Sequence, residues 1–526
     1  MIVLQNITYI HPDKEVLFDN LNLTVNTNKM ALIGHNGTGK STLLKIIAGR
    51  LQPSGGTVTT DSTPYYIPQI FGQFNDLTLA QALRIEDKLK AFNEILAGHV
   101  TETNLTLLND DWTIEDRCRD ALAYWKLEDL DLNQPMHTLS GGQKTKVFLA
   151  GISIHQPEIV LLDEPSNHLD TEGRQLLYDF IQSGTSTILV VSHDRTLLNR
   201  LDSIYELSNR GITMYGGNYD FYAEQKQIEG NALNQDVKSK EKALRRAKEI
   251  EWEAAERKQK LEERGKKQQK KEGTGKAMMD KLKNDSEKSA SRLKGVHAGK
   301  VGAISQELSE LRSTLPELDK MKFGFDNSSL HKGKILITAK DINYGYGDRL
   351  LWKEPLSFQI TSGERIALTG LNGSGKTTLL KLILGKIEPR CGTIYRADRQ
   401  AVYIDQDYSL IDNQLTVYEQ AQRFNYSSLP EHEIKIRLNR FLFSKEYWDM
   451  SCNTLSGGEK MRLMLCCLTI SNQAPDLIIL DEPTNNLDIQ NIGILTGAIN
   501  EYKGTLLVVS HDTYFLEQVN IERMLK

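Results

Sequence analysis

GHNGTGKS at residues 34–41 and GLNGSGKT at residues 370–377 repeat one glycine-rich pattern in the two halves of a 526-residue chain. Each copy follows a short apolar run and precedes a run of helical spacing, so each is expected on a turn from a strand into a helix. Glycines let successive backbone N–H groups face inward there, and the helix N-terminus adds its positive dipole end. A triphosphate fits such a nest. The sequence therefore predicts an α/β chain with two P-loop nucleotide-binding domains.

Both loops carry a lysine and a hydroxyl where ATP chemistry needs them. Lys40 and Lys376 are expected to reach the β- and γ-phosphates, while the hydroxyls of Ser41 and Thr377 are expected to bind Mg²⁺. A single such pattern also arises in ordinary glycine-rich turns, but two copies in register with further motifs argue against chance. The residues predicted to bind ATP in the two loops are Gly34, Asn36, Gly37, Gly39, Lys40, Ser41 and Thr42, and Gly370, Asn372, Gly373, Gly375, Lys376, Thr377 and Thr378.

Two continuously apolar runs, IVLL and LIIL, end in an Asp–Glu pair. Unbroken apolar runs are typical of parallel strands buried on both faces. Asp163 and Asp481, at the strand ends, are expected to hold the metal through water. Glu164 and Glu482, one residue on, are expected to orient and deprotonate the attacking water. An Asp–Glu pair alone is more often a solvated turn, so its weight comes from the other motifs in each half.

LSGGQ at residues 139–143 and LSGGE at residues 455–459 point to a known family, because both resemble the signature motif of the ATP-binding cassette ATPases. A Ser-Gly-Gly sequence that leads into a helix is a second phosphate site rich in N–H groups. In that family the signature serves the ATP of the opposite module, which implies head-to-tail pairing of the two halves within a monomer. The signature residues expected to bind ATP are Ser140, Gly142, Ser456 and Gly458.

The same resemblance implies roles for three further kinds of residue. Glutamines in YYIPQ and VYIDQ resemble Q-loop residues that contact metal and water, histidines in two Ser-His pairs resemble the switch residue at the γ-phosphate, and aspartates in SNHLD and TNNLD resemble D-loop residues. The D-loop aspartates are Asp170 and Asp488. The implied catalytic residues are Glu164, Glu482, His193, His511, Gln69 and Gln406. The implied Mg²⁺ ligands are Ser41, Gln69, Asp163, Thr377, Gln406 and Asp481.

An aromatic side chain some 25 to 30 residues before the P-loop lysine usually stacks on adenine in these cassettes. By this resemblance Tyr346 fits that role in the second half, whereas the first half offers Tyr9 or His11. Tyr9 could instead pack on a strand surface. Since both halves keep the lysine, glutamine, glutamate and histidine, both sites are expected to hydrolyse ATP.

Composition narrows the class of protein further. The net charge of −5 is ordinary for a globular protein, and the five cysteines show no C-x-x-C spacing, so a zinc site or disulfide framework is not indicated. No apolar run approaches the roughly 20 residues that cross a bilayer. A cytoplasmic location without a membrane span is expected. Three domains are predicted, at residues 1–218, 219–325 and 326–526.

The middle domain is predicted to be an antiparallel α-helical coiled-coil linker. Apolar residues recur three and four positions apart in its second stretch, which is a heptad pattern, and the first stretch follows the same rhythm less strictly. They are Leu233, Val237, Leu244, Ala247, Ala254 and Leu261, and Val301, Ile304, Leu308, Leu311, Leu315 and Leu318. Pro316 implies a bend or a helix start at the base.

Between these stretches, residues 257–300 hold fifteen Lys or Arg against six acidic residues, a net charge of +9 in a chain that is otherwise acidic. A basic tip on an acidic protein is the pattern expected for a polyanion partner. The alternative is a charged helical pair that is merely solvated. Against that reading, KKQQKKEGTGK breaks the helix with glycines and presents lysines on a loop.

Two cassettes, a charged linker and the stretch YGGNYDFY at residues 215–222 resemble the F family of ATP-binding cassette proteins over nearly the whole chain. The resemblance implies binding at the ribosomal tRNA exit site, with the linker reaching toward P-site tRNA and the peptidyl transferase centre. The implied partners are ribosomal and transfer RNA. ATP would close the modules and permit binding, and hydrolysis would release them. The chain would be a translation factor or an antibiotic-resistance ribosomal protection protein. A long linker and only about 20 inserted residues near 88–111 favour the second role.

Two rival classes remain. A transporter ATPase with separate membrane subunits also pairs its cassettes, but it needs no basic hairpin between them. A DNA-associated cassette ATPase carries its coiled coil inside one module rather than between two.

Overall fold

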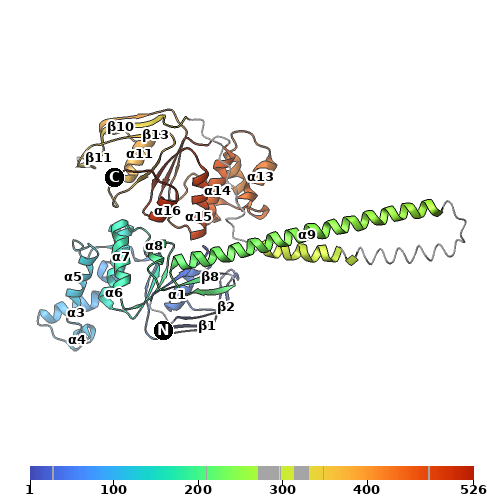
Figure 1. Cartoon of the computed structure of the whole chain (residues 1–526). Helices are drawn as coiled ribbons and strands as arrows, with labels where there is room; N and C mark the ends of the chain where they lie inside the picture. Colours follow the sequence, from blue (N-terminus) through green and yellow to red (C-terminus); the bar gives the residue numbers. More distant parts are fainter. Residues whose placement is uncertain are drawn as a thin grey trace. The chain divides into compact units, whose positions relative to one another are not determined.

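The computed structural model describes residues 1–25, 29–208, 210–269, 295–296, 298–312, 331–347, 349–471 and 474–525 (Figure 1). Contacts divide the chain into a unit that holds Met1–Tyr222 and Met321–Lys526 and a unit that holds Ala223–Lys320. Among the described residues no helix combines the length and the apolar character that a bilayer crossing needs.

The first half of the larger unit centres on a six-stranded sheet of order β5-β6-β7-β3-β8-β9, parallel except for its last pair. Its strands are β3 (Lys29–Ile33), β5 (Tyr65–Ile67), β6 (Ile159–Asp163), β7 (Thr187–Val191), β8 (Ser203–Ser208) and β9 (Gly211–Tyr215). Every residue of β6 is buried, as its continuous apolar run predicts. The helices that follow the strands are α1 (Lys40–Ile47), α6 (Gly141–His155), α7 (Thr171–Ser183) and α8 (Arg195–Leu198). The carboxyl ends of β3, β6 and β7 therefore carry the motifs to one edge.

A second, antiparallel sheet of order β2-β1-β4 packs on the same core. Its strands are β1 (Ile2–Ile10), β2 (Val16–Val25) and β4 (Gly55–Thr60). Ile2 and Leu4 of β1 belong to one cluster with Leu43 and Leu44 of α1 and with Leu161 of β6. The helix that begins at the P-loop lysine is thus anchored on both sheets.

Short helices link the glutamine of the first half to its signature motif. They are η1 (Gly72–Phe74), α2 (Leu79–Ala82), α3 (Glu86–Leu96), α4 (Glu102–Leu108), α5 (Ile114–Tyr124) and η2 (Met136–Thr138). The predicted insertion near 88–111 falls on α3 and α4. Its two ends are tied together, because Asp111 pairs with Lys88 at 3.0 Å and with Arg117 at 2.8 Å. The insertion is therefore a short helical pair closed at its base.

The second half repeats this plan with a five-stranded parallel sheet of order β16-β17-β18-β14-β19 and an antiparallel sheet of order β13-β10-β15. The strands are β10 (Ile335–Asn343), β11 (Gly345–Tyr346), β12 (Arg349–Leu350), β13 (Leu356–Thr361), β14 (Arg365–Leu368), β15 (Cys391–Arg396), β16 (Ala401–Ile404), β17 (Leu477–Asp481), β18 (Thr505–Val509) and β19 (Arg523–Leu525). The helices are α11 (Lys376–Leu384), α12 (Val417–Arg423), α13 (Glu431–Arg440), η4 (Lys445–Tyr447), η5 (Cys452–Thr454), α14 (Gly457–Ile470), α15 (Ile489–Glu501) and α16 (Thr513–Gln518). The duplicated α/β architecture predicted from the repeated motifs is confirmed.

All five cysteines are free thiols. Cys391 at the start of β15 is exposed, whereas Cys118, Cys452, Cys466 and Cys467 are buried. Burial raises the pKa of Cys118 and of Cys452 to about 11, which keeps both thiols protonated at neutral pH.

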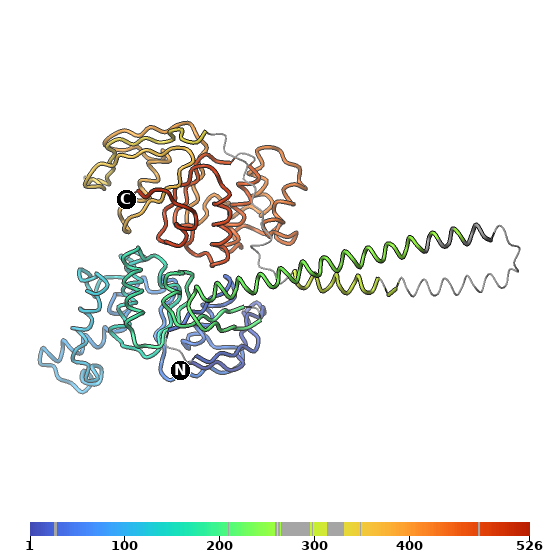
Figure 2. The backbone as a smooth tube through the Cα atoms, viewed as in Figure 1, coloured from blue at the N-terminus to red at the C-terminus, as the bar shows by residue number. Residues whose placement is uncertain are grey.

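The smaller unit contains most of the long helix α9 (Tyr219–Gln269) and a returning helical stretch at 298–312, which run side by side in opposite directions (Figures 1 and 2). Of the predicted heptad residues, Val237, Ala247 and Leu308 are buried. Lys240 bonds Glu307, and Arg312 bonds Glu241 at 2.6 Å, across the pair. The predicted helical hairpin is confirmed where it is described.

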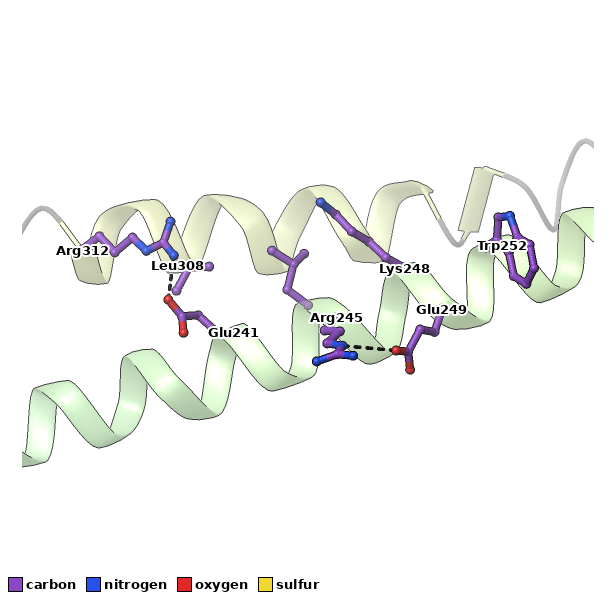
Figure 3. A pocket seen from close by; sticks show the side chains of 8 residues that line it. Glu241, Arg245, Lys248, Glu249, Trp252, Leu308 and Arg312 are labelled. Carbon is purple, nitrogen blue, oxygen red and sulfur yellow. Dashed lines mark hydrogen bonds and ion pairs between the residues drawn. The ribbon is translucent and has the colours of Figure 1, made fainter. Parts of the chain in front are cut away.

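An open groove of about 450 Å³ lies along this helical pair (Figure 3). Leu244 and Leu308 form its apolar floor, and Arg245 pairs with Glu249 at 3.3 Å on its rim. Trp252, 67% exposed, stands at one end. The described residues do not include most of the predicted basic tip at 257–300. They also do not include Leu315, Pro316 or Leu318.

Replacing Trp125 with alanine is expected to cost about 3–5 kcal/mol, because the side chain is fully buried and contacts Tyr124 and Phe180. The measurement is the urea midpoint of unfolding followed by circular dichroism. Trp112→Ala is the matched control, since that side chain is 47% exposed. Equal midpoints for the two variants would contradict the packing described.

Candidate functional site

The first P-loop bends through glycine conformations that other residues avoid. Gly34 and Gly39 have φ of 152° and 91°. A Cβ at Gly34 would lie 2.3 Å from the carbonyl oxygen of Leu207, and one at Gly39 would lie 2.6 Å from the Phe18 ring. Neither position accepts a side chain without displacing its neighbours. The loop can therefore turn its N–H groups inward close to β8 and β2.

The lysine of each P-loop lies under the arch of its own loop. Lys40 Nζ donates to the carbonyls of Gly34 and His35 at 2.7 and 2.9 Å. Lys376 Nζ donates to the carbonyls of Gly370 and Leu371 at 2.8 and 3.1 Å. Burial lowers the pKa of both lysines, although nearby carboxylates oppose that shift. Each loop thus holds a cation inside the ring of N–H groups that a phosphate would enter.

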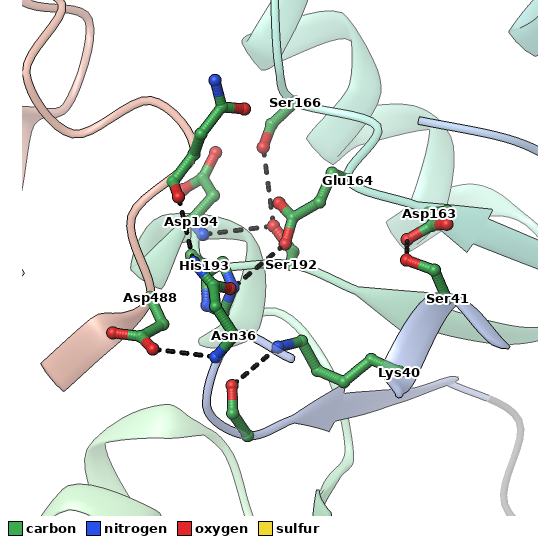
Figure 4. Close-up of polar contacts among 12 residues, drawn as sticks. Asn36, Lys40, Ser41, Asp163, Glu164, Ser166, Ser192, His193, Asp194 and Asp488 are labelled. Atoms are coloured by element: carbon green, nitrogen blue, oxygen red, sulfur yellow. Dashed lines mark hydrogen bonds and ion pairs between the residues drawn. The ribbon is translucent and has the colours of Figure 1, made fainter. Parts of the chain in front are cut away.

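Hydrogen bonds hold the carboxylates at the strand ends, and Figure 4 shows the one between Asp163 and Ser41. Asp163 accepts a hydrogen bond from Ser41 Oγ at 3.0 Å and another from the Tyr66 hydroxyl at 3.2 Å. Asp481 accepts one from the Tyr403 hydroxyl at 2.8 Å. Burial raises the pKa of both aspartates, and these donors counter part of that rise.

The glutamates that follow adopt left-handed backbone conformations, with φ of 51° at Glu164 and 47° at Glu482. Their N–H groups donate to the carbonyls of Val191 and Val509 at 2.8 Å. A non-glycine residue in this region is strained and persists only where its surroundings impose it. The two halves thus share this conformation at the residue that follows the strand-end aspartate.

Each glutamate faces the histidine predicted to share its site. Glu164 Oε1 lies 3.3 Å from His193 Nε2, and Glu482 Oε1 lies 3.5 Å from His511 Nε2. Burial raises the pKa of Glu164 to about 8 and that of Glu482 to about 7. Burial also lowers the pKa of His193 to about 3 and that of His511 to about 4. Both imidazoles are therefore neutral at neutral pH, so neither pair is an ion pair.

The two signature serines are helix N-caps. Ser140 accepts from the N–H of Gln143 at the start of α6, and Ser456 accepts from the N–H of Glu459 at the start of α14. In both halves the residue three positions on bonds back, which completes a capping box. The helix starts, with their free N–H groups, are therefore fixed where the Ser-Gly-Gly sequence predicts.

The P-loop of each half is hydrogen-bonded to the D-loop region of the other. Asn36 N–H donates to Asp488 Oδ2 at 2.9 Å, and Asn36 Nδ2 donates to the Asn486 carbonyl at 3.0 Å (Figure 4). The matching bonds run from Asn372 N–H to Asp170 Oδ2 at 3.4 Å and from Asn372 Nδ2 to the His168 carbonyl at 3.0 Å. Both aspartates also cap the helices that follow them, α7 and α15. In each half the P-loop asparagine thus bonds the D-loop region of the other half.

A cavity of about 470 Å³ gathers the first set of predicted residues. Those that line it are His11, Asn36, Gly37, Gly39, Lys40, Ser41, Thr42, Gln69, Asp163, Glu164 and His193. Asn486 from the second half closes one side. The oxygens of Ser41, Asp163 and Gln69 form a hard donor set, which suits Mg²⁺ when phosphate oxygens supply further ligands.

The residues predicted to stack on adenine differ in their surroundings between the two halves. His11 lines the first cavity, while Tyr9 packs against the core beside it, with ring centroids 5.4 Å apart. Of these two candidates in the first half, His11 is the one that lines the cavity. Tyr346 is 65% exposed on β11, and its hydroxyl lies 3.3 Å from Thr378 Oγ1.

Four residues that lie inside the quoted motifs, but to which the sequence analysis gave no role, also belong to these sites. Asn167 and Asn486 follow the two acidic pairs and line the first cavity. Tyr66 and Tyr403 bond the strand-end aspartates. The signal for the tyrosines is present in the sequence, because each stands three residues before the glutamine in its half.

Comparisons with known proteins agree with this geometry. The family described as ABC transporter matches residues 18–167 and 354–485. The putative ATP-binding protein YdiF of Bacillus subtilis is 31% identical over 96% of this chain and 77% of YdiF. The ATP-binding protein Uup of Escherichia coli is 30% identical over 96% of this chain and 77% of Uup. ABC transporter F family member 5 of Arabidopsis thaliana is 28% identical over 98% of this chain and 74% of that protein.

Solved structures share the fold across the chain. An archaeal ribosome recycling factor, crystallised with an archaeal ribosomal stalk protein, superposes with a TM-score of 0.55 at 21% identity, covering 99% of this chain and 86% of that one. RNase-L Inhibitor superposes with a TM-score of 0.57 at 20% identity, covering 98% and 86%.

Proposed function

Because the chain belongs to the F family of ATP-binding cassette ATPases, we propose that it binds the ribosome in a form set by ATP bound at its two sites. ATP hydrolysis is the activity of this family, and the paired motifs supply it twice. The observation that carries the proposal is the reciprocal bonding of each P-loop to the opposite D-loop. A nucleotide held between such surfaces would stabilise the paired halves.

The proposed hydrolytic step uses residues of both motifs in each half. Lys40 and the loop N–H groups would hold the phosphates, and Ser140 and Ser456 would each cap the nucleotide of the opposite half. Glu164, once deprotonated, would accept the proton of the attacking water, with neutral His193 placed beside it at 3.3 Å. Mg²⁺ held by Ser41, Asp163 and Gln69 would offset the charge that develops on the phosphate. Glu482, His511, Thr377, Asp481 and Gln406 would act in the same way in the second half.

The proposed partner of the linker is RNA. Residues 257–300 carry a net +9, which favours phosphate, and the domain limits at 219 and 325 are proposed to bound this segment. One solved relative in fold is titled as a ribosome recycling factor with a ribosomal stalk protein. By the family resemblance, we propose that the chain binds at the tRNA exit site, with the linker directed to P-site tRNA and the peptidyl transferase centre. Its role is that of a translation factor or a ribosomal protection protein against antibiotics.

A sucrose-gradient experiment tests this proposal. The variant with Glu164→Gln and Glu482→Gln, loaded with ATP, is expected to sediment with 70S ribosomes, and the same variant with ADP is expected to stay at the top. Sedimentation that is independent of nucleotide would contradict the proposed switch. Association with permease subunits in place of ribosomes would favour the transporter alternative.

Ribosome binding is expected to weaken by at least about tenfold as salt rises from roughly 50 to 200 mM, since lysines that neutralise phosphates release counterions. The measurement is the dissociation constant of the ATP-loaded variant from 70S particles at each salt concentration. ATP affinity measured at the same concentrations is the control. Flat ribosome affinity would contradict a phosphate-contacting linker.

A further inference from the structure

A tyrosine stands beside the strand-end aspartate in both halves, on the neighbouring edge strand. Tyr66 of β5 is opposite Leu161 of β6, and Tyr403 of β16 is opposite Ile479 of β17. Residues directly opposite on paired strands point to the same face, and so do residues two apart on one strand. Each tyrosine therefore shares a face with the aspartate two residues beyond its partner. The tyrosine side chain is long enough to reach from its own position to that aspartate.

The contact that results is the same in both halves. The Tyr66 hydroxyl donates to Oδ2 of Asp163 at 3.2 Å, and the Tyr403 hydroxyl donates to Oδ2 of Asp481 at 2.8 Å. In the first half the other oxygen, Oδ1, is the one that meets Ser41 at 3.0 Å. In the first half, Tyr66 thus bonds one carboxylate oxygen of Asp163, and the other oxygen is directed at the Ser41 hydroxyl.

A cationic side chain lies over the face of each tyrosine ring. The guanidinium of Arg50 lies 5.0 Å from the Tyr66 ring centroid, and the ammonium of Lys386 lies 5.0 Å from that of Tyr403. Both cations stand ten positions after the P-loop lysine of their half. Cations over an aromatic face stabilise the ring position. A repeated set of cation, tyrosine and aspartate is more than incidental packing.

We propose that Tyr66 and Tyr403 are positioning residues, which orient Asp163 and Asp481 so that one carboxylate oxygen is available to Mg²⁺ beside the P-loop hydroxyl. This inference rests on the proposed metal site. A side chain that hydrogen-bonds a metal-binding carboxylate fixes the orientation of that carboxylate. Loss of such a hydrogen bond typically weakens metal binding by 10–100-fold. The phosphate nest itself makes no contact with either tyrosine hydroxyl and is not expected to change.

The test is the double variant with Tyr66→Phe and Tyr403→Phe in the full chain. The Mg²⁺ concentration for half-maximal binding of a fluorescent ATP analogue is expected to rise by about tenfold. Affinity for the analogue in EDTA and the melting temperature are expected to stay unchanged. Mn²⁺ titrated with a non-hydrolysable ATP analogue, with free Mn²⁺ read by electron paramagnetic resonance, should show the same weakening without any turnover.

The matched control is Tyr65→Phe with Tyr408→Phe. The Tyr65 hydroxyl donates to the Phe148 carbonyl at 3.2 Å, and the buried Tyr408 hydroxyl has no hydrogen-bond partner among the described residues. An unchanged Mg²⁺ requirement in the Tyr66 and Tyr403 variant would overturn the inference. An equal loss of affinity in EDTA, or an equal rise in the control, would overturn it as well. A wild-type chain that binds the analogue equally well without Mg²⁺ would instead refute the proposed metal site. Failure to sediment with ribosomes would leave the tyrosine inference standing.

Discussion

Replacing Glu164 and Glu482 together with glutamine is expected to slow ATP hydrolysis by about 10²–10⁴-fold while ATP stays bound. Glutamine keeps the size and the hydrogen-bonding reach of the side chain toward the histidine, 3.3 Å away in the first half, but it cannot accept the proton of the attacking water. The phosphate-binding loops are formed by other residues, at 34–41 and 370–377, and the substitutions leave them unchanged. Phosphate release and the affinity for a fluorescent ATP analogue, measured on the same preparation, check the two halves of this expectation.

The contrasting variant is Lys40→Met with Lys376→Met. It removes the cations inside the phosphate loops, so ATP affinity itself should fall. The single changes Glu164→Gln and Glu482→Gln then report each site separately. Unaltered turnover in the double glutamine variant would contradict the assignment of the base. Loss of ATP binding in that variant would instead assign these carboxylates to nucleotide binding.

Deleting residues 257–300 and joining the ends with a short Gly-Ser linker is expected to abolish the effect on the ribosome while ATP binding persists. Both cross-helix pairs of the described hairpin, Lys240 with Glu307 and Glu241 with Arg312, lie outside the deletion. The remaining helical pair should therefore still form. The measurement is protein synthesis in a purified translation system, with the intact double glutamine variant for comparison.

A charge-reversal variant separates the length of the linker from its charge. Changing Lys266, Lys267, Lys270 and Lys271 to glutamate keeps the length of the linker and replaces four positive charges with four negative ones. It should match the deletion if phosphate contacts carry the function. Normal behaviour of both variants would show that this segment is a spacer.

The fold was predictable because its signals are local and occur twice. The apolar run before Asp163 indicated a buried strand, and the glycine-rich turn followed by helical spacing indicated a passage from a strand into a helix. Heptad spacing likewise predicted the helical pair, with Val237 and Leu308 buried as expected. These features depend on neighbours within a few residues.

The remaining site residues depend on distant parts of the chain. Tyr66 meets Asp163 only because β5 pairs beside β6, and no local pattern gives that register. Asn486 reaches the first cavity from the second half, which single-motif reasoning cannot place. The choice between Tyr9 and His11 required knowing which side chain packs on the core. The sequence thus predicted the secondary structure and the motif of each segment. The long-range contacts of the side chains depended on how strands and halves pair in the folded chain.

The exposed thiol of Cys391 makes the native chain a ready substrate for spectroscopic labelling. Four of the five cysteines are buried, so a maleimide dye should attach at one point without a cysteine-free background. That point is on the antiparallel sheet of the second half. A donor fluorophore there, with an acceptor on an engineered cysteine at exposed Met214, would report opening and closing in single molecules as nucleotide is exchanged.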